Sequence, residues 1–191
     1  MSSRPAHSAH PRRPCRLRSR CTGVTLIEAA VATAVVAVLL GTVAPGFQEL
    51  RLRRQLEGVA AQLETDMQLA RSEAVARQQS VRIGFHAGAD GASCYVLHTG
   101  PAHACRCDGA GTTTCAGDAE ALRSVPLAAG YPVQLRSNSG SILFDAVKGT
   151  VTPTATVRVT APVGEIRQIV NVMGRVRSCS PDGAVAGYRP C

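Results

Sequence analysis

The order of apolar and polar positions divides the chain into three parts. Residues 1–23 are polar and contain no apolar run. Residues 24–44 are almost entirely apolar, and as a helix they would extend about 30 Å, the thickness of a bilayer core. After residue 80, apolar and polar residues alternate or form short apolar runs, as they do in strands. The pattern therefore predicts one membrane-spanning helix followed by a β-rich body.

A second helical segment is expected over residues 45–79. Pro45 and Gly46 should bend or loosen the helix where it leaves the membrane. Beyond them, apolar residues recur every three or four positions, which is the pattern of one apolar stripe on a helix. The stripe consists of Leu52, Leu56, Val59, Leu63, Met67, Ala70 and Ala74. This half of the helix should therefore pack on the following sheet.

The body, residues 80–191, is expected to contain seven strands separated by Gly and Pro. They are placed at residues 81–86, 94–98, 121–126, 132–136, 141–145, 151–159 and 165–173. Residues 99–120 lack periodicity and are expected to form a long loop. The fold class that follows is α+β: a long N-terminal helix, half membrane-spanning and half amphipathic, packed on a C-terminal antiparallel sheet domain.

The positive charge of the chain is concentrated at its start. The formal net charge is +8, but six of the 21 basic residues lie in residues 1–23, which contain no acid. Residues 24–191 therefore hold 15 basic residues against 13 acidic ones. A basic segment before a spanning helix is expected to stay in the cytoplasm, so the body should be exported. The overall charge is thus weak evidence that the body binds nucleic acid.

Six of the eight cysteines follow the membrane segment, which indicates disulfides formed in an oxidising compartment. Cys179 and Cys191 would close a C-terminal loop, and the other four, Cys94, Cys105, Cys107 and Cys115, could form two further bridges. Cys105 and Cys107 are too close in sequence to bridge each other. Six cysteines allow 15 connectivities, so the pairing stays open.

A metal site is the alternative use of those four cysteines, with His98 and His103 as further ligands. Their spacings fit no zinc template, so neither a metal nor another cofactor is expected. The acids are scattered and no phosphate-binding glycine loop opens a helix. No catalytic residues are therefore proposed, and the chain is expected not to be an enzyme.

Glu28 is an acid in the apolar segment, where a lone charge costs a few kcal/mol unless it has a partner or lies near the interface. The stretch Gly23-Val24-Thr25-Leu26-Ile27-Glu28 resembles the processing motif of type IV pilins and type II secretion pseudopilins. The resemblance implies that a prepilin peptidase cleaves between Gly23 and Val24 and methylates the Val24 amine. It also implies that Glu28 pairs with an N-terminal amine during assembly. Val24 departs from the family, which usually has Phe or Met there.

The same resemblance implies a location and partners. Pro45 stands where these proteins often carry a helix-kinking proline. The chain would be a single-pass protein of the bacterial inner membrane with a periplasmic C-terminal domain, assembled with other pilins or pseudopilins into a filament. The stretch from Leu69 to Arg77 looks like the helix end of the FimT/GspH group of minor pilins and pseudopilins, where it leads into the first strand.

Two arginines near the C-terminus carry the only functional hypothesis beyond assembly. In extended chain, Arg175 and Arg177 point the same way, and two guanidinium groups on one face suit phosphate oxygens. Gly174-Arg175-Val176-Arg177 is similar to a motif of FimT-type minor pilins, which are associated with the capture of double-stranded DNA for natural transformation. The alternative is that these arginines only solvate an edge strand. The chain would then be a structural minor pseudopilin or a pilus-priming minor pilin without DNA binding.

Overall fold

The computed structural model describes residues 24–88 and 90–191. They form two compact units, divided between Thr42 and Val43, and each is described on its own. The helix α1 is assigned from Leu26 to Arg77 and therefore contributes to both units. Its assignment continues through Pro45 and Gly46. The bend or loosening of the helix expected at Pro45 and Gly46 stays a prediction.

The described part of the first unit, which begins at Val24, is an apolar and mainly helical segment that exposes its side chains. Leu26, Ile27 and Leu40 are each more than three-fifths exposed, and Val31 and Val35 more than half. Apolar side chains left in water are costly, at about 1.5–3 kcal/mol for each one that could be buried. Among the described residues, α1 is the one helix long and apolar enough to cross a membrane. Lipid, or neighbouring helices within it, is the environment that would bury this surface.

In the second unit the apolar stripe of α1 faces the core. Leu56, Leu63, Met67, Ala70 and Ala74 are buried, at 1% exposed or less. The sequence prediction of an amphipathic helix packed on the body is therefore correct. Two ion pairs lie on the other face of this segment. They join Arg53 to Glu57 at 3.0 Å and Arg77 to Glu73 at 2.8 Å.

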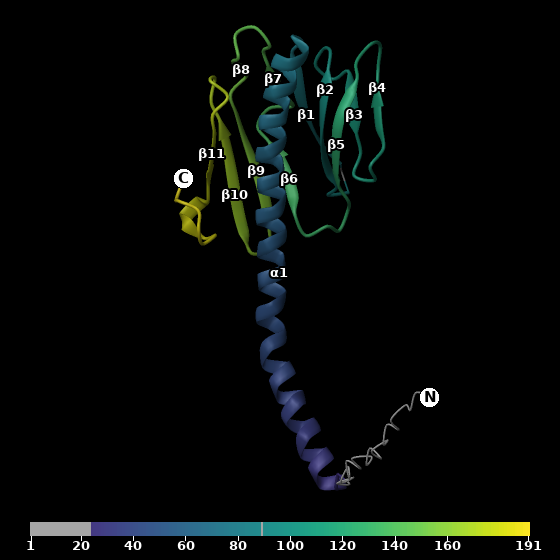
Figure 1. Cartoon of the computed structure of the whole chain (residues 1–191), viewed down its shortest axis with the longest axis vertical. Helices are drawn as coiled ribbons and strands as arrows, with labels where there is room; N and C mark the ends of the chain where they lie inside the picture. Colours follow the sequence, from purple (N-terminus) through teal and green to yellow (C-terminus); the bar gives the residue numbers. More distant parts are fainter. Residues whose placement is uncertain (1–23, 89) are drawn as a thin grey trace, which may run out of the picture. The chain divides into compact units, whose positions relative to one another are not determined.

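The body contains three antiparallel sheets (Figure 1). The five-stranded sheet has the order β5 (Ala121–Leu127), β2 (Ser93–Thr99), β1 (Val81–Ala87), β7 (Ser141–Phe144), β8 (Val151–Thr152). The four-stranded sheet has the order β11 (Val176–Cys179), β10 (Gly164–Val170), β9 (Ala155–Ala161), β6 (Gln134–Ser137). The third is a hairpin of β3 (Cys105–Cys107) and β4 (Thr113–Cys115), and a short 3-10 helix, η1 (Pro181–Gly183), follows β11.

One core joins the second half of α1 to both larger sheets. Leu63 of α1, Tyr95 of β2 and Val157 of β9 belong to the same buried cluster. Figure 1 shows this part of α1 running alongside both sheets. The sheets are also linked directly, because the Leu135 amide in β6 donates a 3.1 Å hydrogen bond to Oγ of Ser93 in β2. The expected α+β fold is therefore confirmed.

Three strand predictions differ from the structure. Residues 151–159 are not one strand but two, β8 and β9, because Pro153 has no amide hydrogen for the ladder. Residues 165–173 end as a strand at Val170, where the chain turns. Another strand, β11, then follows. The strand expected at residues 132–136 is shifted to Gln134–Ser137.

The prediction that residues 99–120 form only a loop is wrong. They contain the hairpin of β3 and β4, in which Cys105 lies opposite Cys115. Strands of three residues are too short to show a period, so the sequence pattern gave no sign of them. The hairpin is fixed instead by disulfide bonds, described below.

Candidate functional site

The start of α1 places Glu28 in the first helical turn. Thr25 precedes the helix, and its Oγ1 accepts a 3.4 Å hydrogen bond from the Glu28 amide. A Thr followed three residues later by Glu is the capping-box pattern, which satisfies free amides at a helix start. Negative charge is also favoured there by the helix dipole. The Glu28 and Val24 side chains are exposed, whereas Gly23 lies outside the described residues.

Gly174 makes the turn that leads into β11. Its φ of +72° lies in the left-handed region, which favours glycine. A Cβ there would also approach the Val151 side chain to 3.1 Å. Asn171 closes the turn: its Oδ1 accepts the Arg175 amide at 2.9 Å, and its carbonyl accepts the Gly174 amide at 2.9 Å. The glycine of the Gly-Arg-Val-Arg stretch therefore sets the backbone that carries Arg175.

The pairing of β11 with β10 fixes the direction of Arg177. Arg177 lies opposite Ile169, and both side chains are exposed. The next residue, Ser178, points to the opposite face, where its hydroxyl donates to Oε2 of Glu64 in α1 at 3.1 Å. Arg177 consequently projects from the sheet face that is turned away from the helix.

A surface hollow of about 560 Å³ lies beside these arginines. It is lined by Ile169, Asn171, Arg175, Val176, Arg177 and Arg189. The structure therefore brings Arg175 and Arg177 together and adds a third arginine. The sequence alone does not place Arg189 at this hollow, because its position depends on how the C-terminal tail folds back. None of the lining residues is acidic.

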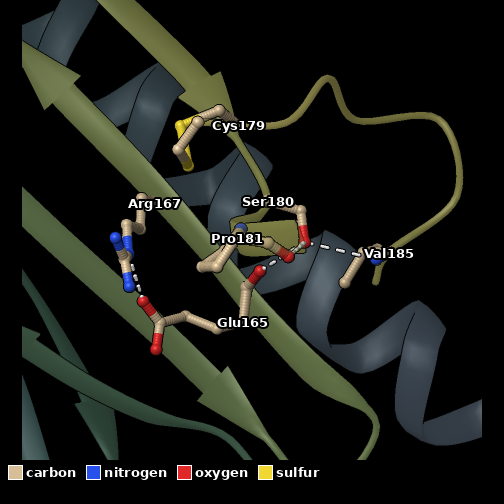
Figure 2. Close-up of a disulfide and its surroundings, with 7 residues drawn as sticks. Glu165, Arg167, Cys179, Ser180, Pro181 and Val185 are labelled. Atoms are coloured by element: carbon tan, nitrogen blue, oxygen red, sulfur yellow. Dashed lines mark hydrogen bonds and ion pairs between the residues drawn. A yellow bond between two sulfur atoms is a disulfide. The ribbon is translucent and has the colours of Figure 1, made fainter. Parts of the chain in front are cut away.

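The Cys179–Cys191 disulfide ties the tail back beside β10 (Figure 2). Next to it, the Ser180 hydroxyl donates to the Glu165 carbonyl at 2.9 Å and accepts the Val185 amide at 3.2 Å. The Ser180 amide donates to the Arg189 carbonyl at 2.9 Å. These contacts hold the backbone of Arg189 next to β11, and thus its side chain at the hollow.

The other four cysteines form Cys94–Cys107 and Cys105–Cys115. Cys105 and Cys107 therefore bridge to different partners. With these bonds formed, the four thiols are not available as metal ligands. Within the described residues, no group of three or more His, Cys, Asp or Glu side chains is arranged to hold a metal ion.

Two histidines lie on the five-stranded sheet, His98 fully buried and His86 partly buried. Nε2 of His86 and Nε2 of His98 have no hydrogen-bond partner within the described part of the chain. Burial lowers the pKa of both imidazoles, and the nearby charge of Arg106 lowers that of His86 further. Nδ1 of His98 lies 2.9 Å from the Thr99 carbonyl, which can only accept, so the ring proton is on Nδ1. These rings are neutral components of the sheet near pH 7.

An apolar N-terminal helix that continues into the core of antiparallel sheets defines a pilin-like protein. The chain matches the family model described as Type II transport protein GspH over residues 59–174, more than half of its length. The chain therefore belongs to the GspH family. The resemblance to minor pilins and pseudopilins of the FimT/GspH group is thus confirmed.

Similar solved structures include proteins from Pseudomonas aeruginosa and Vibrio cholerae. The type IV minor pilin FimU of Pseudomonas aeruginosa is 21% identical, and the match covers 65% of this chain and 88% of that one, with a TM-score of 0.46. The minor pseudopilin EpsH from the Type 2 Secretion System of Vibrio cholerae is 16% identical, covering 65% and 96%, with a TM-score of 0.44. No curated protein shows a significant sequence match to the chain.

Proposed function

We propose that this GspH-family protein is a minor pilin of a type IV pilus that binds extracellular DNA for natural transformation through Arg175 and Arg177. The observation that carries the proposal is the hollow beside β11, which three arginines line and no acid lines. Guanidinium groups bind phosphate oxygens in bidentate geometry, so this cluster matches the backbone of a nucleic acid. Such contacts do not read the base sequence, so the binding is nonspecific.

The rigidity of the motif supports this use. Asn171 holds the Arg175 amide, and the β10–β11 pairing holds Arg177. A preorganised pair of arginines loses less conformational freedom on binding than two on a mobile tail. The Cys179–Cys191 disulfide extends the same restraint to the tail that carries Arg189.

The proposal includes processing and topology. A prepilin peptidase would cleave between Gly23 and Val24 and methylate the new amine, after which Glu28 would pair with an N-terminal amine in the filament. Residues 24–44 would span the inner membrane, and residues 45–191 would be periplasmic until assembly. Pro45 would kink the helix at the membrane exit. The exposed apolar first unit and the capped position of Glu28 support this arrangement.

The test is binding of double-stranded DNA by the full-length chain in a nonionic detergent, measured at several salt concentrations. Arg175→Ala/Arg177→Ala should weaken binding and reduce the slope of log K against log salt by about 2, since each phosphate contact contributes about 0.9. Arg51→Ala/Arg54→Ala removes the same charge from exposed positions on α1 and serves as the control. Equal binding by wild type and the Arg175/Arg177 variant would refute the proposal.

A structural minor pseudopilin of type II secretion is the second candidate. The description of the family as a type II transport protein favours it. Arg177 also lies on β11, an edge strand of its sheet, where charge discourages pairing with another strand. In that case the full-length chain would not bind DNA, and the Arg175/Arg177 variant would instead associate through its sheet edge.

A further inference from the structure

The outward face of the four-stranded sheet carries a row of arginines that runs across three strands. Arg136 of β6 lies directly opposite Arg158 of β9. Arg158 in turn lies directly opposite Arg167 of β10. Since residues opposite each other in antiparallel strands are on the same face, all three side chains project from one side of the sheet. We call them the arginine row.

Burial along the strands shows which side this is. Arg136 and Arg158 are exposed and Arg167 is partly exposed, whereas their strand neighbours Leu135, Val157 and Ile166 are buried in the core. The arginine row is therefore on the face turned away from α1. Neighbouring strands lie about 4.8 Å apart, so the row extends about 10 Å across the sheet.

The row continues to the hollow at β11. Arg167 lies opposite Cys179, and Arg177 is two residues from Cys179 on the same strand and face. Diagonal neighbours of this kind have Cβ atoms about 7–8 Å apart, within reach of arginine side chains. A path of positive charge thus leads from Arg136 on one edge of the sheet to Arg175 beside the other edge.

Little negative charge offsets this face. At the outward positions of the four strands the one acid is Glu165, which is hydrogen-bonded and ion-paired to Arg167 (Figure 2). Within residues 24–88 and 90–191, Arg136 and Arg158 form no ion pair. Like charges directly opposite each other destabilise a sheet. The chain therefore keeps a repulsive arrangement at the centre of a sheet face.

Edge protection does not explain this arrangement. Charges on β6 or β11 would discourage pairing at the sheet edges, but β9 and β10 are interior strands. If these positions only had to keep the sheet face hydrated, Thr, Gln or Ser side chains would do so without charge repulsion. A polyanion lying on the face would remove the repulsion, and duplex DNA offers about one negative charge per 1.7 Å of its axis.

We infer that the arginine row Arg136–Arg158–Arg167 is the second half of a DNA-backbone-binding face. Duplex DNA lies across the strands of the four-stranded sheet and contacts both the row and the hollow at Arg175 and Arg177. This inference rests on the proposed function and extends it, because it adds a set of phosphate contacts outside the Gly-Arg-Val-Arg stretch. It also gives the DNA a direction, across the strands.

The test compares full-length chains in nonionic detergent for affinity to duplex DNA between 50 and 200 mM salt. Arg136→Gln/Arg158→Gln/Arg167→Gln should lower the salt slope by about 2 to 3, so wild type should lose roughly 16- to 64-fold more affinity over this range than the variant. Arg136→Lys/Arg158→Lys/Arg167→Lys keeps the charge and should retain most of the slope. Arg51→Gln/Arg54→Gln/Arg106→Gln removes three charges from elsewhere and should behave as wild type.

The outcomes separate this inference from the proposed function. If the Gln variant of the row keeps the wild-type slope while Arg175→Ala/Arg177→Ala loses it, the inference is wrong and the proposed function stands. If the row variant loses binding and the Arg175/Arg177 variant does not, the proposed site at Arg175 and Arg177 is wrong, and with it the inference that DNA contacts both the row and the hollow. If wild type does not bind DNA, both are wrong. A row variant with normal DNA binding but impaired filament incorporation would assign the face to a neighbouring subunit and overturn the inference.

Discussion

The hydroxyl of Tyr95 in β2 donates a 2.7 Å hydrogen bond to Oδ2 of Asp66 in α1, and both residues are fully buried. Oδ1 of Asp66 accepts a hydrogen bond from Gln62 at 3.1 Å and pairs with Nε of Arg123 in β5 at 3.2 Å. A buried carboxylate is tolerated when it is hydrogen-bonded and paired in this way. Asp66 thus links the helix to two neighbouring strands of the five-stranded sheet.

Replacing Tyr95 by Phe should destabilise the body by about 1–3 kcal/mol, because Oδ2 of Asp66 would remain buried without its donor. Denaturant unfolding of the full-length chain in detergent, followed by circular dichroism, measures the loss. Tyr131→Phe is the control, since Tyr131 is exposed. A loss for Tyr95→Phe no larger than for Tyr131→Phe would contradict this role of the hydrogen bond.

The body should lose stability as the pH falls below about 6.5. The pKa values of His86 and His98 are lowered in the folded protein, chiefly by burial and also by Arg106 near His86 and Arg82 near His98. Near pH 6 the unfolded chain therefore binds more protons at these histidines than the folded chain does. The free energy of unfolding is therefore highest above the histidine pKa of the unfolded chain, and it decreases as the pH falls below that pKa. Unfolding midpoints at pH 7.5, 6.5 and 5.5 measure it.

The matched variant for this pH dependence is His86→Gln/His98→Gln. It should be less dependent on pH between 7.5 and 5.5 than wild type, whatever its stability at neutral pH. His103→Gln is the control, since the His103 side chain is exposed. If the double variant follows the wild-type pH profile, the acid sensitivity originates elsewhere in the chain.

The C-terminal disulfide should contribute to both stability and DNA binding. Cys179→Ser/Cys191→Ser should cost about 3 kcal/mol of unfolding free energy in the chain-entropy account, and it should free the tail that holds Arg189 at the hollow. Cys94→Ser/Cys107→Ser is a close match, because the two bridges span 12 and 13 residues. DNA affinity should fall for the first variant only. An equal fall for both would mean that general destabilisation is responsible.

The sequence predicted the helix and most of the strands because their patterns are local. The stripe from Leu52 to Ala74 repeats over six turns, and the strand at 81–86 alternates within itself. Asp66 was missed although its position was informative: it stands three residues after Leu63 and four before Ala70, on the buried side of the stripe. A lone acid at such a position indicates a buried partner.

The candidate site was only partly predictable, because its second half depends on strand register. Arg175 and Arg177 are close in sequence, so their common direction follows from one strand. Arg136, Arg158 and Arg167 come from three strands, and nothing in the chain order states that β6 pairs with β9. The position of Arg189 similarly depends on which cysteine Cys191 pairs with.

Glu28→Gln should separate membrane insertion from assembly. The variant is nearly isosteric, so residues 24–44 should still insert. Removing a charge from the membrane-spanning segment should, if anything, make insertion more favourable. If the Glu28 carboxylate pairs with an N-terminal amine in the filament, its removal should lower incorporation at least tenfold. A tenfold loss corresponds to a pairing free energy of about 1.4 kcal/mol. Incorporation is measured by immunoblotting of sheared filaments against the membrane fraction, with intact mass checking the N-terminus at Val24.

The control for Glu28 is Thr33→Val in the same helix. The Thr33 hydroxyl donates to the carbonyls of Ala29 and Ala30, so its hydrogen bonds stay within one helix and its loss should not affect incorporation. Wild-type incorporation of Glu28→Gln would show that the acid has no partner in the filament and lies at the interface. Reduced incorporation of Glu28→Gln and of Thr33→Val alike would indicate a general effect on the helix. Only a selective defect assigns Glu28 to assembly, because only a charge pair depends on the carboxylate.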